Sequence, residues 1–169
     1  RFGTTYTYYS TLEDAFAYTD TLSTTSDKYA VITILKDGLS VNAKCSATGY
    51  IKLIANGNFT LTRNCDDVMF DCDSLVIGDE NSPKFTINGN NKAYSLITSD
   101  FLTLINVTLL GNGGQNATTG PAGAGCAKVF TLYIYDGVTV SGFYATGTSG
   151  AASSGGAFSL GPSSTLPTG

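Results

Sequence analysis

The sequence contains no histidine and no tryptophan, a single methionine, and few charged residues, which make up 13% of its 169 residues. Without histidine there is no imidazole to act as a general acid or base, and no catalytic triad of the usual kind. The formal net charge of −4 excludes the basic stripe that nucleic-acid binding needs. We therefore expect no enzyme activity, no cofactor and no nucleic-acid partner.

Long apolar runs are also missing. The longest candidate, residues 96–110, is interrupted by Thr, Ser, Asp and Asn, whereas a membrane-spanning helix needs about 20 mostly apolar residues. We therefore expect no membrane span. Thr, Tyr, Val, Ile and Phe are frequent instead, and these residues favour β-strands. A chain of this length suits one domain with a substantial core.

The sequence repeats one pattern, in which a short apolar strand leads through a polar turn into a second short strand. The five copies are residues 34–41, 53–61, 76–89, 102–109 and 132–140. Their starts lie 19 to 30 residues apart, a period typical of coils that stack into a solenoid. The pattern predicts an all-β, right-handed parallel β-helix over residues 31–169, incomplete at its C-terminal end. A β-sandwich is the alternative fold.

The turns of this pattern carry recurring dipeptides, namely Asp37-Gly38, Asn56-Gly57 and Asp136-Gly137. Such pairs also form tight hairpin turns, which is the reason for keeping the sandwich as an alternative. Here they occupy the same position in each repeat, so we interpret them as one corner of the β-helix, repeated from coil to coil.

One segment predicts a helix. Ser10-Thr11-Leu12-Glu13 fits a capping box, with Ser10 as the N-cap and Glu13 reaching back to it. Leu12, Ala15 and Phe16 then share one helical face. We expect residues 1–30 to form an N-terminal strand and a helix that caps the coils.

Four cysteines and no metal-type spacing predict two disulfides, and hence an oxidising compartment. The cysteines are Cys45, Cys65, Cys72 and Cys126. Aligning the first two repeats places Cys45 and Cys65 at nearly the same position of adjacent coils, within disulfide range. The preferred pairing is therefore Cys45–Cys65 with Cys72–Cys126, and a local Cys65–Cys72 bridge is the alternative.

Three N-glycosylation sequons point to the same compartment. Their acceptor residues are Asn58, Asn106 and Asn116. Together with the paired cysteines they predict an extracellular protein, either secreted or held at the cell surface.

An acidic run between two cysteines is the sharpest polar feature. Its four carboxylates belong to Asp66, Asp67, Asp71 and Asp73. They could bind Ca²⁺, which takes six to eight oxygen ligands, or act as paired acids in glycoside hydrolysis. A solvated loop is the simpler interpretation, and we assign no catalytic residue and no metal site beyond this weak calcium candidate.

Several segments resemble secreted β-helix adhesins. These segments are residues 11–15, 84–90 and 102–109, and Ser154-Gly155-Gly156-Ala157-Phe158. The last is similar to the Gly-Gly-Ala repeat of the polymorphic outer-membrane proteins of chlamydiae and their relatives. The partner Phe-x-x-Asn motif of that family does not recur as a repeat. The resemblance implies adhesion or surface display, with a glycan or a cell-surface ligand as a possible partner, and it supplies no catalytic residue.

The C-terminal part of the sequence suggests a further partner. Residues 155–160 have the pattern of the first strand of another coil, and an uncovered coil is an exposed sheet edge that invites pairing. We therefore expect self-association or contact with a neighbouring β-helix segment, including a head-to-tail filament in which the Tyr- and Thr-rich residues 4–9 are donated as a strand. The alternative function is a carbohydrate-active or carbohydrate-binding β-helix, similar to polysaccharide lyases and hydrolases.

Overall fold

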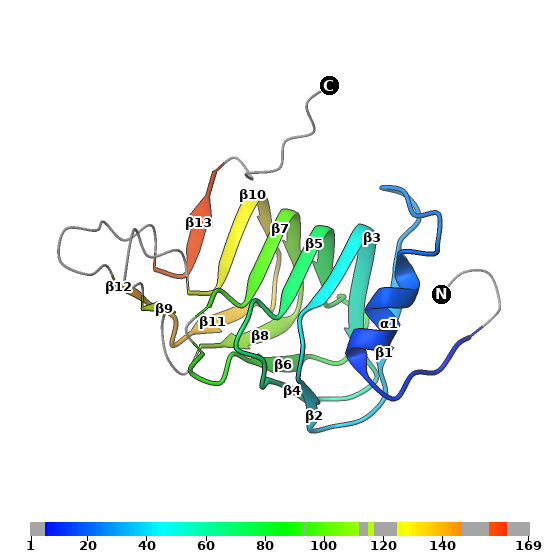
Figure 1. Cartoon of the computed structure of the whole chain (residues 1–169), viewed down its shortest axis with the longest axis horizontal. Helices are drawn as coiled ribbons and strands as arrows, with labels where there is room; N and C mark the ends of the chain where they lie inside the picture. The colour runs from blue at the N-terminus through cyan, green and yellow to red at the C-terminus, as the bar shows by residue number, and fades with distance from the viewer. Residues whose placement is uncertain (1–5, 93, 112–114, 117–124, 147–155, 162–169) are drawn as a thin grey trace.

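Parallel strands wind around one core in the computed structural model, which describes residues 6–92, 94–111, 115–116, 125–146 and 156–161 (Figure 1). The six-stranded first sheet has the order β1 (Ala30–Ile34), β3 (Cys45–Ala55), β5 (Phe70–Ile77), β7 (Ile97–Leu104), β10 (Ala127–Ile134) and β13 (Phe158–Leu160). The five-stranded second sheet has the order β11 (Thr139–Ser141), β8 (Val107–Leu110), β6 (Phe85–Asn88), β4 (Thr60–Arg63) and β2 (Leu39–Val41).

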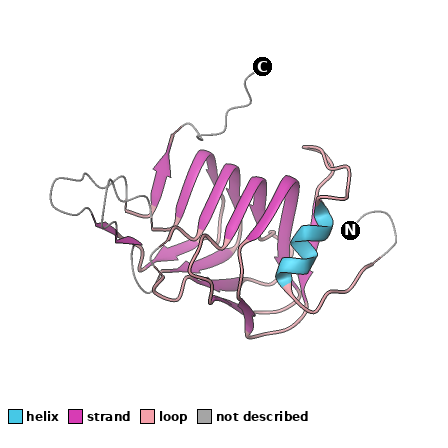
Figure 2. Ribbon diagram, in the orientation of Figure 1, coloured by secondary structure: helices cyan, strands magenta, loops and turns pink. Residues whose placement is uncertain are grey.

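The chain passes from the first sheet to the second and back, so each strand pairs with the strand one coil away (Figure 2). All strand pairs that the structure describes are parallel, including the small pair of β9 (Gln115–Asn116) and β12 (Ala145–Thr146). This parallel β-solenoid confirms the coarse fold prediction. A sandwich built from hairpins is excluded, because its neighbouring strands would be antiparallel.

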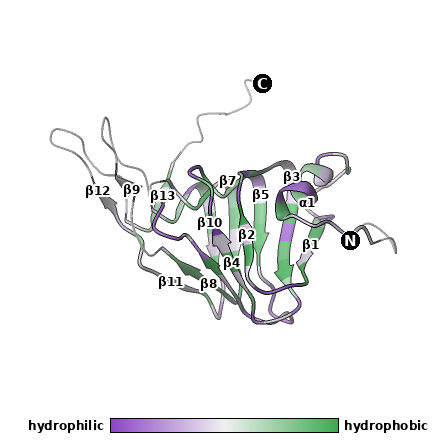
Figure 3. Ribbon diagram, turned by 60° about the horizontal axis from the view of Figure 1, so that its bottom comes forward, coloured by the Kyte–Doolittle hydropathy of each residue, from purple (hydrophilic) through white to green (hydrophobic). Residues whose placement is uncertain are grey.

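The core lies between the two sheets and is built from the inward half of each alternating strand. In β4 and β6, for example, buried and half-buried residues alternate, as expected for strands with one face on the core. Figure 3 shows the apolar residues concentrated on the strands and polar residues in the connections. Each of the five predicted repeats contains the end of a first-sheet strand and a strand of the second sheet.

The predicted corner is confirmed at the transition from the first sheet to the second. Gly38 and Gly137 both lie there and have φ angles of +68° and +76°, which glycine adopts without steric cost. Asn106 occupies the corner between β7 and β8 with a φ of +47°, which Asn tolerates better than most residues. The Asp37 side chain accepts the N–H of Gly38 at 2.8 Å and that of Thr60, in the next coil, at 2.7 Å.

The helix α1 (Leu12–Thr19) forms where the sequence predicts it, but its N-terminus differs in detail. The N-cap is Thr11, whose Oγ1 accepts the N–H of Asp14 at 3.2 Å, so the assignment of Ser10 was wrong by one residue. Leu12 and Phe16 are buried as expected, and the rings of Phe16 and Phe70 lie 5.5 Å apart. No helix of the described residues is long and apolar enough to span a membrane.

Candidate functional site

The four aspartates of the acidic run do not converge on a metal. Asp66 forms an ion pair with Lys92 at 2.8 Å, and this contact holds the pKa of the Asp66 carboxyl below its usual value. Asp71 pairs with Lys44 at 2.9 Å. The residues that the structure describes contain no group of three or more His, Cys, Asp or Glu side chains able to hold a metal ion. The weak calcium candidate therefore gains no support from the described residues and stays a prediction.

The other two aspartates of the run point to different surroundings. The Asp67 carboxylate accepts the N–H of the next residue at 2.7 Å, as in a turn. Asp73 lines a polar cavity of about 490 Å³ together with Asp20, Tyr50 and Phe101. Burial, followed by the charges of Asp100 and Asp20, raises the pKa of the Asp73 carboxyl. Among the four aspartates of the run, Asp73 is therefore the one whose carboxyl group is best placed for chemistry with a bound molecule.

The cavity nevertheless lacks a free pair of acids for hydrolysis. Asp20 Oδ1 accepts the backbone N–H of Thr48 at 2.7 Å and the hydroxyl of the same residue at 3.2 Å. That carboxylate is thus committed to the edge of β3. Two carboxyl groups free to act as acid and base are the minimum for the usual glycosidase mechanisms, so the arrangement fits binding of a polar ligand better than catalysis.

A different feature distinguishes the C-terminal end of the solenoid, where no described strand covers part of the core. Leu53, Ile77, Leu104 and Ile134 lie level with one another on successive strands. The first three are 0% exposed, whereas Ile134 is 52% exposed. Each inner residue of this row is covered by the next coil, and no described strand covers Ile134.

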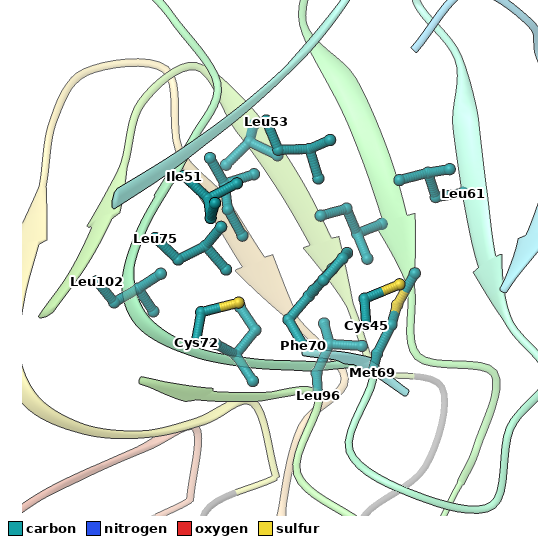
Figure 4. Close-up of a cluster of buried hydrophobic side chains, with 14 of the residues drawn as sticks. Cys45, Ile51, Leu53, Leu61, Met69, Phe70, Cys72, Leu75, Leu96 and Leu102 are labelled. Atoms are coloured by element: carbon teal, nitrogen blue, oxygen red, sulfur yellow. The ribbon is translucent and has the colours of Figure 1, made fainter. Parts of the chain in front are cut away.

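A second row of inward positions ends in the same way. Ala47, Cys72, Ser99, Val129 and Leu160 are level with one another in the first sheet. The first four are at most 5% exposed, and Leu160 is 64% exposed. Figure 4 shows Cys72 among the side chains that fill the closed part of the core. The last coil therefore presents side chains of core type to the surface.

The open end has the shape of a step. The strand β13 pairs only with Ala127–Val129, the first half of β10, and no described strand pairs with Thr131–Ile134 on that side. Figure 1 shows β13 next to β10 at the end of the first sheet. We call the uncovered half of β10 together with β13 the C-terminal step. It contains no charged residue and no proline.

The N-terminal end of the solenoid contrasts with this step, because side chains from α1 and the loop after it satisfy the edge of β3 and the turn before it. Glu13 Oε1 accepts the backbone N–H groups of Asn42 and Ala43. Asp20 Oδ1 accepts the N–H of Thr48, and Thr24 Oγ1 accepts the N–H of Tyr50. These distances run from 2.7 to 3.1 Å. The capping box predicts that Glu13 bonds back to the start of its own helix. In the structure Glu13 instead bonds to the turn before β3.

An apolar groove of about 550 Å³ lies beside β1 at this same end. The N-terminal residues 6–11, the helix α1 and the strand β1 line it, with Leu35 and Tyr8 among the exposed side chains. Two of its lining residues, Tyr9 and Tyr18, contact each other with tilted rings whose centres lie 5.6 Å apart. The chain's own N-terminal segment thus already flanks the free edge of β1.

The structure contains four free, buried thiols in place of the two disulfides expected from the sequence. The preferred pairing assumed that Cys45 and Cys65 are level, but Cys45 lies level with Phe70. The strand β3 is eleven residues long and its register shifts between Ala47 and Tyr50, so aligning the repeats by their turns misplaces the cysteines. Burial raises the pKa of the Cys72 thiol to about 12, which makes it a poor nucleophile.

The three sequons lie in different settings. Asn58 is exposed in the connection between β3 and β4. Asn106 is half-buried, and its Nδ2, the atom that a glycan would occupy, donates to the carbonyl oxygen of Ser82 at 3.0 Å. Asn116 lies in β9, and its side chain is outside the described residues. Glycosylation at these three positions stays a prediction, and Asn58 offers the freest acceptor of the two that the structure describes.

Sequence reasoning anticipated another coil after residue 155 but did not identify Ile134 and Leu160 as exposed core positions. The available signal was their place in the last copies of the repeat that the sequence shows. Comparison of the chain with family models, with curated proteins and with solved structures finds no match.

Proposed function

We propose that this chain is an extracellular, N-glycosylated structural or adhesive protein that associates through the C-terminal step. The observation that carries the proposal is the exposure of core-type side chains at Ile134 and Leu160. An exposed, uncharged strand edge normally pairs with another chain unless charges, proline or a covering segment block it. An apolar end of this kind suits assembly and offers nothing for a chemical step.

Several other observations support a structural role. The strands are parallel and right-handed crossovers are the rule for such connections, so we infer that the coils are right-handed. The side chains of Glu13 and Asp20 satisfy backbone groups at the first coil, which supports a capping role for α1. The sequons support the extracellular location, and the similarity to polymorphic outer-membrane proteins is consistent with surface display.

Electron microscopy of the native extracellular material tests this function. We expect the protein in the extracellular or cell-surface fraction, in regular associations such as pairs, arrays or filaments. Recovery only from the cell interior, or as unassociated particles with enzymatic activity, would contradict the proposal.

Carbohydrate binding is a second candidate function, and the polar cavity favours it. Tyr50 and Phe101 line this cavity beside Asp73, and aromatic side chains with acceptor groups are suited to sugars. Glycan-array binding that is lost in Asp73→Asn, while Asp27→Asn binds like the wild type, would support this function. Release of sugars from polygalacturonate or alginate that is lost in Asp73→Asn would establish an enzyme instead.

A further inference from the structure

We propose that two copies of this chain pair tail to tail through the C-terminal step, which forms a closed two-fold dimer. This inference rests on the function proposed above and names the partner as a second copy. In the dimer, β13 of each copy lies against the uncovered Thr131–Ile134 of the other, so the two half-coils complete one shared layer.

The shape of the step carries this pairing. In each copy β13 pairs with Ala127–Val129 of β10, and no described strand pairs with Thr131–Ile134 on that side. A two-fold axis along the normal of the first sheet reverses the strands and exchanges the two halves of β10. The covered half of one copy then faces the uncovered half of the other, and β13 of the second copy runs antiparallel to β10 of the first. Such a surface is complementary to itself, as an isologous interface requires.

At the opposite end of the solenoid, the free edge of the first sheet that the described residues show is that of β1, which lies level with the second half of β3. The N–H groups around the start of β3 already bond to Glu13, Asp20 and Thr24. The helix α1 lies beside the first half of β3. In β10 it is likewise the first half that pairs with β13. A head-to-tail stack would bring α1 of one copy against β13 of the next at the same level. The geometry therefore favours a closed pair over an open filament.

The composition and size of the step agree with an interface. Its uncovered strand, Thr131–Ile134, and β13 contain no charged residue, and interface centres are depleted in charge and enriched in tyrosine. Three residues of the step, Tyr133, Ile134 and Leu160, and the adjoining Tyr135 are each 51 to 64% exposed. A large side chain buries about 150–250 Å², so these four supply roughly 400 Å² per copy. The half-buried residues around them, such as Phe158, extend this toward the roughly 800 Å² per partner of a standard interface.

A pair of matched charge substitutions tests which end is used. Leu160→Lys places two like charges in the proposed interface, whereas Leu35→Lys alters an apolar residue, 56% exposed, at the N-terminal end. In sedimentation equilibrium we expect the wild type and Leu35→Lys to have twice the 17.6 kDa mass of the chain. Leu160→Lys should associate at least about tenfold more weakly, the loss typical of an interface hot spot. Because both side chains are more than half exposed, circular dichroism should show both variants folded.

Cross-linking through a single introduced cysteine tests the symmetry. A Cβ added at Gly161 or at Gly156 meets no atom within 4 Å, so both positions tolerate cysteine. Gly161 directly follows β13 and lies near the proposed axis, while Gly156 precedes β13 and lies far from it. Only residues close to a two-fold axis reach their own copies within the 4.4–6.8 Å Cα distance of a disulfide. We expect Gly161→Cys to give a disulfide-linked dimer and Gly156→Cys to remain unlinked, since the native thiols are buried.

The outcomes separate this inference from the function on which it rests. A dimer weakened by Leu160→Lys and cross-linked by Gly161→Cys supports the tail-to-tail pair. Equal weakening by Leu35→Lys, or growth of the wild type beyond a dimer, establishes head-to-tail contacts and overturns it. A monomeric wild type also overturns it, and if the native material nevertheless assembles at the cell surface, the proposed function stands with a different partner.

Discussion

Arg63 makes the sharpest test of what stabilises the solenoid, because it is a cation buried without a carboxylate. It ends β4 with its side chain pointing into the core, and it is 2% exposed. Its guanidinium donates five hydrogen bonds of 2.9 to 3.3 Å, all to backbone carbonyl oxygens. The acceptors belong to Asp67, Gly89, Lys92, Tyr94 and Ser95. One side chain thus holds two connections of adjacent coils in place.

The cost of removing this guanidinium follows from the acceptors it leaves behind. Arg63→Met keeps most of the apolar stem, and it removes both the hydrogen bonds and the burial cost of the charge. The bonds to Gly89 and Ser95 are the two whose groups are fully buried. A hydrogen bond to a charged group contributes roughly 1.5–3 kcal/mol, so the loss of these two bonds costs about 4 kcal/mol. This corresponds to a fall in Tm of roughly 8–16 °C for a domain of this size.

Urea unfolding followed by tyrosine fluorescence measures this loss, since the chain has ten tyrosines and no tryptophan. Lys36→Met is the matched control, because it removes an exposed cation, and its effect should stay within about 0.5 kcal/mol. Arg63→Lys keeps the charge but loses the planar fork, and should fall between the wild type and Arg63→Met. An Arg63→Met protein within about 1 kcal/mol of the wild type would refute the reasoning, since the freed carbonyl oxygens would then cost almost nothing.

Three further outcomes follow from the structure. Thiol titration should find four protected thiols in the folded chain and four reactive ones in urea without reductant, whereas two disulfides would leave none. Glycopeptide mapping of the secreted protein should find Asn58 occupied and Asn106 empty, and a glycan on Asn106 would mean that its bond to Ser82 is broken. Asp73→Asn should raise the urea midpoint at pH 7, because the raised pKa of the Asp73 carboxyl means that the folded state binds its proton more tightly. The difference should shrink as the pH falls through that raised pKa, and a constant difference would contradict the assignment.

The repeat was visible in the sequence because the corner residues and the alternation of apolar residues both recur with each coil. Asp37-Gly38 and Asp136-Gly137 mark the same corner of the structure, and the strands beside them were predicted with their approximate bounds. The helix was visible for a similar reason, since Leu12 and Phe16 share one face. These signals are local, so a single sequence contains them.

The failures concern contacts between segments far apart in the chain. Glu13 was expected to bond within its own helix, but its partners are the N–H groups of Asn42 and Ala43, 29 and 30 residues away. The predicted cysteine pairing assumed equal coils, whereas the register in β3 is irregular and Cys45 lies level with Phe70. Nothing in the local sequence marks Arg63 as buried, since its five acceptors are backbone groups that any residue type provides.

The direction of the backbone hydrogen bonds has a mechanical consequence. In both large sheets these bonds run along the axis on which the coils stack, and each coil contacts only its neighbours. A tension along this axis therefore loads one strand pair at a time and unzips the stack coil by coil. The strand β13, held by three register pairs, yields first. A tension parallel to the strands instead shears all the bonds of a pair together, so the molecule is weak along its axis and strong across it.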